Sequence, residues 1–320
     1  MTENGYAVRL RGVTKRFGKH TAVSNLDLDV PRGIICGLLG PNGSGKTTTI
    51  RMIMGILLPD EGSVQLFGED PDVTRRTKVG YLPEERGVYR KMKCAEFVTF
   101  LAEIRGLPRA EGRRRALEWL DRLGLPEWAD KRVEDLSKGM QQKIQFIGTV
   151  IHEPELLILD EPFSGLDPIN QDVLEQIVRD FRAKGTTILF STHLMDQAER
   201  LCEHVCLISK SHKVLDADMR ELRASERGGV VAVEFEGSDR WIAGPEVLDI
   251  GHVNGEVQLR LAAGADHQEI LRRGVNAGAT ILRFDLVEPR LHDIFVRYAG
   301  ADATGDAGTP VAAQAHKGGA

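Results

Sequence analysis

The most informative segment of the sequence is Gly40-Pro41-Asn42-Gly43-Ser44-Gly45-Lys46-Thr47. It has the form G-x-x-x-x-G-K-[ST] and follows the apolar run Ile34–Leu39. From Thr48 onward, apolar residues recur at helical spacing. Glycines let successive N–H groups turn inward around phosphate oxygens, and the start of a helix adds its positive dipole end. The motif predicts that Gly40 to Thr48 bind nucleotide phosphates, with Lys46 at the outer phosphates as a catalytic cation and Thr47 on Mg²⁺.

The surrounding sequence predicts the kind of sheet that carries this loop. Ala7–Leu10 and Leu26–Val30 alternate in hydrophobicity like strands of a half-buried antiparallel sheet. Leu156–Leu159 and Thr187–Phe190 are continuous apolar runs, each followed by a helical pattern, as in buried parallel strands. Residues 85–135, which precede Leu156 in the sequence, have helical spacing. We therefore predict an α/β fold with a mixed sheet.

Two carboxylates, Asp160 and Glu161, follow the apolar strand Leu156–Leu159. An unpaired buried charge is costly, so such a strand rarely ends in acids without a function. Ligands bind at the carboxyl ends of parallel strands. Asp160 is therefore the expected Mg²⁺ partner and Glu161 the general base that activates a water. A pair of solvated turn acids is the alternative, although the phosphate loop argues against it.

A third motif, Leu136-Ser137-Lys138-Gly139-Met140-Gln141-Gln142, is similar to the signature LSGGQQ of ABC (ATP-binding cassette) nucleotide-binding domains. The chain resembles this family, a class of P-loop NTPases, over residues 7–216, with the motifs in the family order. Lys138 and Met140 depart from the signature. Ser137 and Gly139, which in the family contact the γ-phosphate of ATP on the opposite subunit, are present. The resemblance implies that Ser137, Gly139 and Gln141 bind nucleotide.

Further segments are similar to other motifs of the same family. Ser164-Gly165-Leu166-Asp167 resembles the D-loop, which crosses the dimer interface, so Asp167 is expected near a nucleotide. His193 resembles the switch histidine, expected at the γ-phosphate and the attacking water, and Phe17 corresponds to the aromatic residue that stacks on adenine. Gly80-Tyr81-Leu82-Pro83-Glu84-Glu85 aligns with the Q-loop, where Glu84 stands in place of the usual glutamine. Glu84 is expected to be a metal or water ligand.

The resemblance and the pattern of hydrophobicity also divide the chain. Residues 1–217 are expected to form the ABC ATP-binding domain, with an antiparallel β subdomain and a helical subdomain at about 85–150. Residues 218–229 are a predicted linker, and residues 230–299 a small accessory α/β domain. Residues 300–320 contain almost no large apolar side chain and are expected to be disordered. YLPEERG and the C-terminal EPRLHDIFVRYAG resemble the ATPase subunits of sodium exporters.

The composition argues against several function classes. With 42 Lys and Arg against 47 Asp and Glu, the net charge is −5, and no long block of like charge indicates a nucleic-acid partner. The four cysteines have no disulfide-framework spacing and the N-terminus lacks a signal-peptide core, which favours the cytoplasm. Cys202, His204 and Cys206 are expected on one strand face, but buried free thiols are favoured over a metal site. The apolar runs are far below the roughly 20 residues that span a bilayer.

The resemblance implies an ATPase that works as a pair. Two copies, or one copy and a second ABC subunit, would sandwich two molecules of ATP with Mg²⁺. Their closure would drive export of a small ion or drug-like molecule through an integral membrane permease, at the inner face of the cell membrane. A soluble switch acting on nucleic acid or ribosomes is the alternative, although such proteins usually carry two cassettes or long insertions. Glu161 and His193 together argue against a module that binds ATP without hydrolysis.

Overall fold

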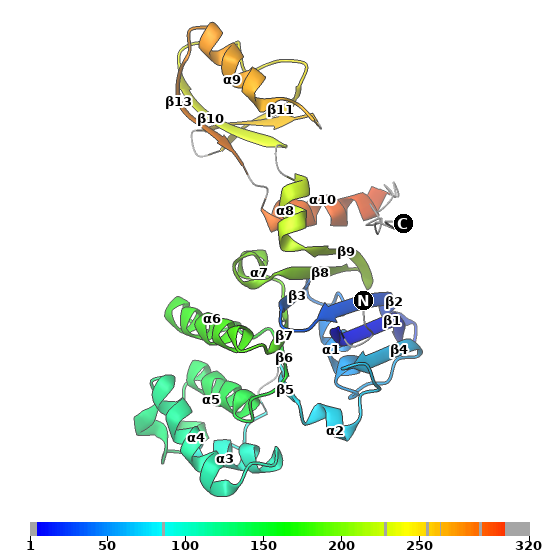
Figure 1. Ribbon diagram of the computed structural model, residues 1–320, viewed down its shortest axis with the longest axis vertical. Helices are drawn as coiled ribbons and strands as arrows, with labels where there is room; N and C mark the ends of the chain where they lie inside the picture. Colours follow the sequence, from blue (N-terminus) through cyan, green and yellow to red (C-terminus); the bar gives the residue numbers. More distant parts are fainter. Residues whose placement is uncertain are drawn as a thin grey trace, which may run out of the picture.

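The computed structural model describes residues 5–84, 87–226, 229–253, 256–262, 264–287 and 290–304. Its centre is a six-stranded sheet in the order β5-β6-β7-β3-β8-β9 (Figure 1). Five strands are parallel: β5 (Val79–Leu82), β6 (Leu156–Asp160), β7 (Thr187–Thr192), β3 (Ile35–Leu39) and β8 (His204–Ser209). The sixth, β9 (His212–Asp218), runs antiparallel to β8. The predicted α/β fold with a mixed sheet is confirmed.

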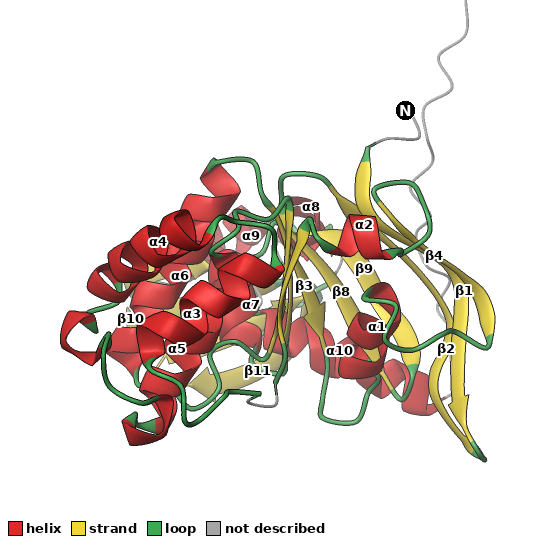
Figure 2. Ribbon diagram, turned by 90° about the horizontal axis from the view of Figure 1, so that it is seen from below, coloured by secondary structure: helices red, strands yellow, loops and turns green. Residues whose placement is uncertain are grey.

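An antiparallel sheet and the helix that follows the phosphate loop cover one face of the central sheet (Figure 2). The sheet has the order β2-β1-β4, with β1 (Tyr6–Phe17), β2 (His20–Pro31) and β4 (Glu61–Leu66), and the helix is α1 (Lys46–Ile53). The short helix α2 (Val73–Arg76) follows β4. β1 and β2 are longer than the alternating segments in the sequence, because register shifts such as the one between Leu10 and Val13 interrupt the alternation without ending the ladder.

Helices cover the opposite face, and they share one buried apolar cluster with β3 and β6. They are α3 (Cys94–Ile104), α4 (Arg109–Arg122), α5 (Lys138–Val150), α6 (Pro168–Ala183) and α7 (Met195–Leu201), with 3-10 turns η1 (Pro126–Trp128) and η2 (Val133–Asp135). Because both faces are covered, every residue of β3, β6 and β7 is buried. The polar side chains that follow these strands therefore emerge together at their carboxyl ends.

A second, smaller unit follows α8 (Met219–Glu226). Its antiparallel sheet has the order β11-β12-β10-β13, with β10 (Val230–Glu236), β11 (Val247–Val253), β12 (Glu256–Leu261) and β13 (Thr280–Leu286). The helix α9 (His267–Asn276) packs on this sheet through Ile270, in a cluster with Val231, Val233 and Trp241. β11 was not expected from the sequence, because its apolar residues alternate with Asp249 and Gly251 too briefly to be distinguished from a loop.

The final helix, α10 (Leu291–Thr304), differs from the sequence expectation in two ways. Its buried residues Leu291 and Ile294 belong to the apolar cluster of the cassette and not to that of the small sheet. It also continues to Thr304, past the predicted start of the disordered tail at residue 300, because the alanines there favour a helix. The remainder of that tail, residues 305–320, lies outside the described residues. Within the described ranges, no helix combines the length and the apolar character needed to cross a membrane.

Candidate functional site

The phosphate-loop motif forms the turn between β3 and α1. Its backbone takes positive φ at Gly40, Gly43 and Gly45, which favours glycine at these positions. A Cβ at Gly40 would lie 2.1 Å from the carbonyl oxygen of Ile208, and one at Gly45 would lie 2.4 Å from that of Ala22. Only glycine therefore allows this cradle, which brings the N-terminus of α1 to the rim of the site.

Lys46, at the start of α1, points back over the loop. Its Nζ donates to the carbonyl oxygens of Gly40 and Pro41, at 2.7 and 3.2 Å, and lies 3.6 Å from Glu161 Oε1. The side chain of Lys46 is 6% exposed, so its charge acts largely shielded from water. The cation is thus held between the phosphate loop and the acid expected to be the general base.

Asp160 is the last residue of β6, and its two carboxylate oxygens differ in their hydrogen bonding. Its Oδ1 accepts from the hydroxyls of Ser191 and, at 3.4 Å, Thr47, whereas Oδ2 is buried with no hydrogen-bond partner among the described residues. Burial raises the pKa of Asp160, and the hydrogen bonds from Ser191 and Thr47 oppose that effect. A carboxylate that keeps one buried oxygen without a donor among the described residues, while its other oxygen bonds the Thr47 hydroxyl, fits an oxygen-seeking cation such as Mg²⁺.

Glu161 and His193 are brought together by the pairing of β6 with β7. His193 Nδ1 lies 3.0 Å from both carboxylate oxygens of Glu161, whose side chain is 8% exposed. Glu161 has φ 49°, a left-handed conformation that costs a non-glycine residue roughly 1–2 kcal/mol. Its N–H donates to both the carbonyl and hydroxyl oxygens of Ser191, which holds this turn. Strain of this kind is typical of functional positions.

An open pocket of about 480 Å³ lies in front of these groups. Its lining includes the half-exposed ring of Phe17, the loop residues Asn42 to Thr48 except Ser44, and Glu84 and Glu161. Glu84 also lines a smaller adjoining cavity with Asp160 and Ser164. The structure therefore brings together Phe17, the phosphate loop, Glu84, Asp160, Glu161 and His193. Ser191 was missed in the sequence, although its place two residues before His193 could have indicated it.

The signature and D-loop residues lie elsewhere on the chain. Ser137 caps α5, since its Oγ accepts from the N–H of Met140 at 3.3 Å, and Asp167 caps α6 by accepting from the N–H of Asn170 at 3.1 Å. The amide of Gln141 donates to the carbonyl oxygens of Val133 and Leu136, so it is engaged within its own chain. None of these residues, nor Gly139, contributes to the described lining of the 480 Å³ pocket.

Cys202, His204 and Cys206 were expected on one strand face, and this prediction is wrong for Cys202. Cys202 lies in the apolar cluster on the helical side of the central sheet, whereas Cys206 and Cys36 lie in the cluster on the other side. The reason is that β8 begins only at His204, so strand alternation does not extend back to Cys202. His204 Nε2 lies 2.7 Å from Asp216 Oδ1.

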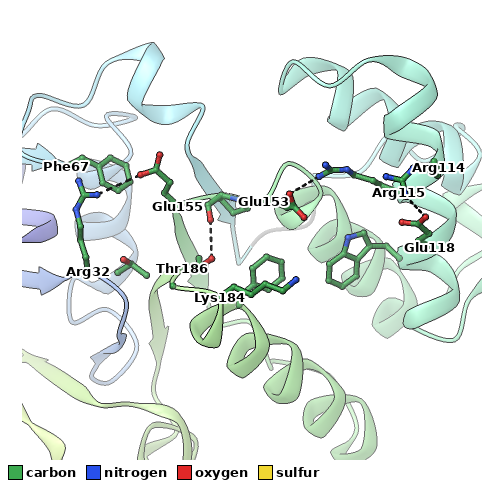
Figure 3. A pocket seen from close by; sticks show the side chains of 14 residues that line it. Arg32, Phe67, Arg114, Arg115, Glu118, Glu153, Glu155, Lys184 and Thr186 are labelled. Atoms are coloured by element: carbon green, nitrogen blue, oxygen red, sulfur yellow. Dashed lines mark hydrogen bonds and ion pairs between the residues drawn. The ribbon is translucent and has the colours of Figure 1, made fainter.

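A larger cavity, of about 560 Å³, opens at the opposite end of the parallel strands (Figure 3). Glu155 precedes β6 there, and Thr187 begins β7. Its charges face one another: Arg115 lies 3.3 Å from Glu153, and Arg32 lies 3.9 Å from Glu155. Because ligands of such sheets bind at the carboxyl ends of the strands, this cavity is distinct from the nucleotide pocket.

Comparisons with known proteins agree with this geometry. Residues 23–164 match the family model described as ABC transporter, and residues 218–299 match that of the ATP-binding protein DrrA1-3-like, C-terminal domain. The uncharacterized ABC transporter ATP-binding protein YhaQ of Bacillus subtilis is 43% identical over 290 residues, or 90% of this chain and 97% of YhaQ. Nod factor export ATP-binding protein I of Ralstonia nicotianae is 38% identical over 233 residues, 72% of each chain. The dimeric bacterial ABC transporter cassette MJ0796 matches with a TM-score of 0.62 at 24% identity, covering 67% of this chain and 99% of that one.

These similarities extend well beyond the residues of the nucleotide pocket. YhaQ is matched over almost its whole length, and the two family models match separate parts of the chain, one in the cassette and one in the C-terminal unit. The chain thus belongs to the ABC transporter family, as an ATP-binding and ATP-hydrolysing subunit that carries a DrrA-like C-terminal domain.

Proposed function

We propose that two copies of this subunit close on two molecules of Mg²⁺-ATP and thereby drive export through a separate membrane permease. The arrangement of Lys46, Glu161 and His193 at one end of β6 and β7 carries the catalytic part of this proposal. The export part is supported by similarity to a Nod factor export ATP-binding protein. Transport would place the subunit at the inner face of the cell membrane, on its permease.

The paired arrangement is supported by where the signature residues lie. Ser137 and Gly139 are absent from the described lining of the pocket that holds the phosphate loop, so within one chain they do not complete that site. The N-terminus of α5 nevertheless offers an anion-binding end beside Gly139. A second copy would place this end, together with the Asp167 turn, on the γ-phosphate. The dimeric cassette MJ0796 has the same fold.

In the proposed reaction a water attacks the γ-phosphorus and the bond to the bridging β–γ oxygen breaks, which releases ADP and phosphate. Glu161 accepts the proton of the water, and His193 holds the Glu161 carboxylate in place from 3.0 Å. The ammonium group of Lys46 stabilises the negative charge that develops on the outer phosphates. Thr47, Asp160 and Glu84 would hold Mg²⁺, which would supply positive charge to the phosphates. Catalysis is thus positioning and charge stabilisation, without a covalent intermediate.

The test is phosphate release by the purified subunit, alone and with candidate membrane proteins from the same cell. We expect turnover to require Mg²⁺, to rise more than linearly with protein concentration because the site is composite, and to be stimulated by a multi-span membrane protein. Stimulation by RNA or DNA, without any response to membrane proteins, would refute the transport part of the proposal. A turnover strictly proportional to protein concentration at high dilution would count against the composite site.

A further inference from the structure

The two helices that connect the C-terminal sheet to the cassette both bond to one residue, Glu199 of α7. Arg223 of the entering helix α8 donates from Nη2 to the carbonyl oxygen of Glu199 at 3.2 Å. The N–H of Leu291, the first residue of the leaving helix α10, donates to Glu199 Oε1 at 2.6 Å. Figure 1 shows both helices between the small sheet and the level of α7. Glu199 is therefore a common attachment point for the C-terminal unit.

Apolar packing reinforces these two bonds. Leu291 and Ile294 of α10 are 2% and 1% exposed, and they share one buried cluster with Ala198 and Leu201 of α7 and Leu222 of α8. Close-packed interiors have low compressibility and transmit displacement. A shift of α10 relative to the cassette must therefore move α7 or open a void in this cluster.

From α7, a short series of hydrogen bonds leads to the loop that presents His193. Gln197 of α7 is 4% exposed, and its Oε1 accepts from the Thr192 hydroxyl at 3.1 Å. The same hydroxyl accepts from the N–H of Leu194 at 3.1 Å. The residues on both sides of His193 are thus fixed by α7. A second contact joins α7 to α6: Arg200 of α7 donates from Nη2 to Glu175 Oε1 of α6 at 2.7 Å.

We propose that Glu199, held by α8 and α10, is a positioning residue that sets His193 against Glu161. This inference rests on the role proposed above for His193. It makes the C-terminal unit a part of the catalytic machinery: a partner or ligand that moves the small sheet alters the rate of hydrolysis through α7, while ATP binding at the phosphate loop is left unchanged. The quantity that tests this proposal is the energetic coupling between Glu199 and His193.

The experiment uses the full-length protein and turnover of radiolabelled ATP. Glu199→Ala is expected to lower kcat about tenfold with little change in KM, since small displacements of reacting groups are costly. Glu199→Gln keeps an oxygen that accepts from Leu291, so we expect it to restore most of the rate. Val296→Ala, at a side chain of α10 that is 54% exposed, is the matched control and should behave as the wild type. Thermal unfolding of each variant checks that the fold is kept.

A double-mutant cycle separates positioning from general damage. In a His193→Ala background, Glu199→Ala should change the residual rate less than about twofold, because the residue that it positions is gone. Equal effects of Glu199→Ala in both backgrounds, or a wild-type kcat for Glu199→Ala, would overturn the inference while leaving His193 catalytic. Full activity of His193→Ala would instead refute the proposed role of His193 itself, and the inference with it.

Discussion

Replacing Glu161 by glutamine is the sharpest test of the chemistry. The substitution keeps the size of the side chain but removes the carboxylate that faces His193 at 3.0 Å and Lys46 at 3.6 Å. An amide cannot accept the proton of the attacking water. General bases contribute about 10²–10⁴-fold to a rate, which corresponds to roughly 2.7–5.5 kcal/mol of activation free energy. We therefore expect kcat to fall by at least about 10²-fold.

Binding of ATP should survive the same change. The glycine cradle and the bonds from Lys46 to the carbonyl oxygens of Gly40 and Pro41 do not involve the Glu161 side chain. Removing a negative charge from a pocket meant for a triphosphate also weakens repulsion. The assay compares steady-state phosphate release with binding of a fluorescent ATP analogue, and gel filtration follows pairing in the presence of ATP. The variant should bind ATP and accumulate as a pair.

The matched control lies next to the other end of the same strand. Glu155 precedes the opposite end of β6, is about half exposed and makes a surface ion pair with Lys78 at 2.9 Å, so Glu155→Gln should leave turnover unchanged. Near-normal ATPase activity in Glu161→Gln would remove Glu161 from the role of base and refute the reasoning. Equal losses in the two variants would point to damage of the sheet instead.

Three more predictions follow from single contacts. Asp160→Asn and Glu84→Gln should each raise the Mg²⁺ concentration at half-maximal ATPase. The effect of Asp160→Asn should be the larger, because Asp160 Oδ2 has no partner among the described residues and Oδ1 accepts from Thr47; an unchanged titration would contradict a metal role. Gly139→Asp should keep ATP binding but abolish turnover, since a Cβ there would lie 3.6 Å from Leu166 Cδ2, an ordinary contact, while its charge would face the other copy's γ-phosphate; retained turnover would refute the pairing. Burial lowers the pKa of His152 to about 4, so stability should fall as pH drops below about 6.5 toward that value, and thermal unfolding of His152→Leu should be less acid-sensitive.

The phosphate loop could be predicted because local sequence decides it. A buried strand, glycines where φ is positive, and a helix beginning at Lys46 are all specified within a few residues. The destination of α10 could not be predicted in the same way. The apolar stripe that contains Leu291 and Ile294 shows that the helix has a buried face, but both the small sheet and the cassette could have covered it. That choice depends on contacts distant in sequence, which no local pattern contains.

The turn at Glu161 explains how two consecutive acids can serve one nucleotide. In a regular strand, neighbouring side chains point to opposite faces of the sheet, so Asp160 and Glu161 would be separated by the backbone. Positive φ at Glu161 ends that alternation: Asp160 stays beside Thr47 and Ser191, while Glu161 turns to Lys46 and His193. The sequence Leu159-Asp160-Glu161-Pro162 does not predict this conformation, because glutamate rarely adopts a positive φ. The strain is offset by the two bonds from the Glu161 N–H to Ser191, so a residue that sequence reasoning overlooked allows the acids to divide their roles between metal and water.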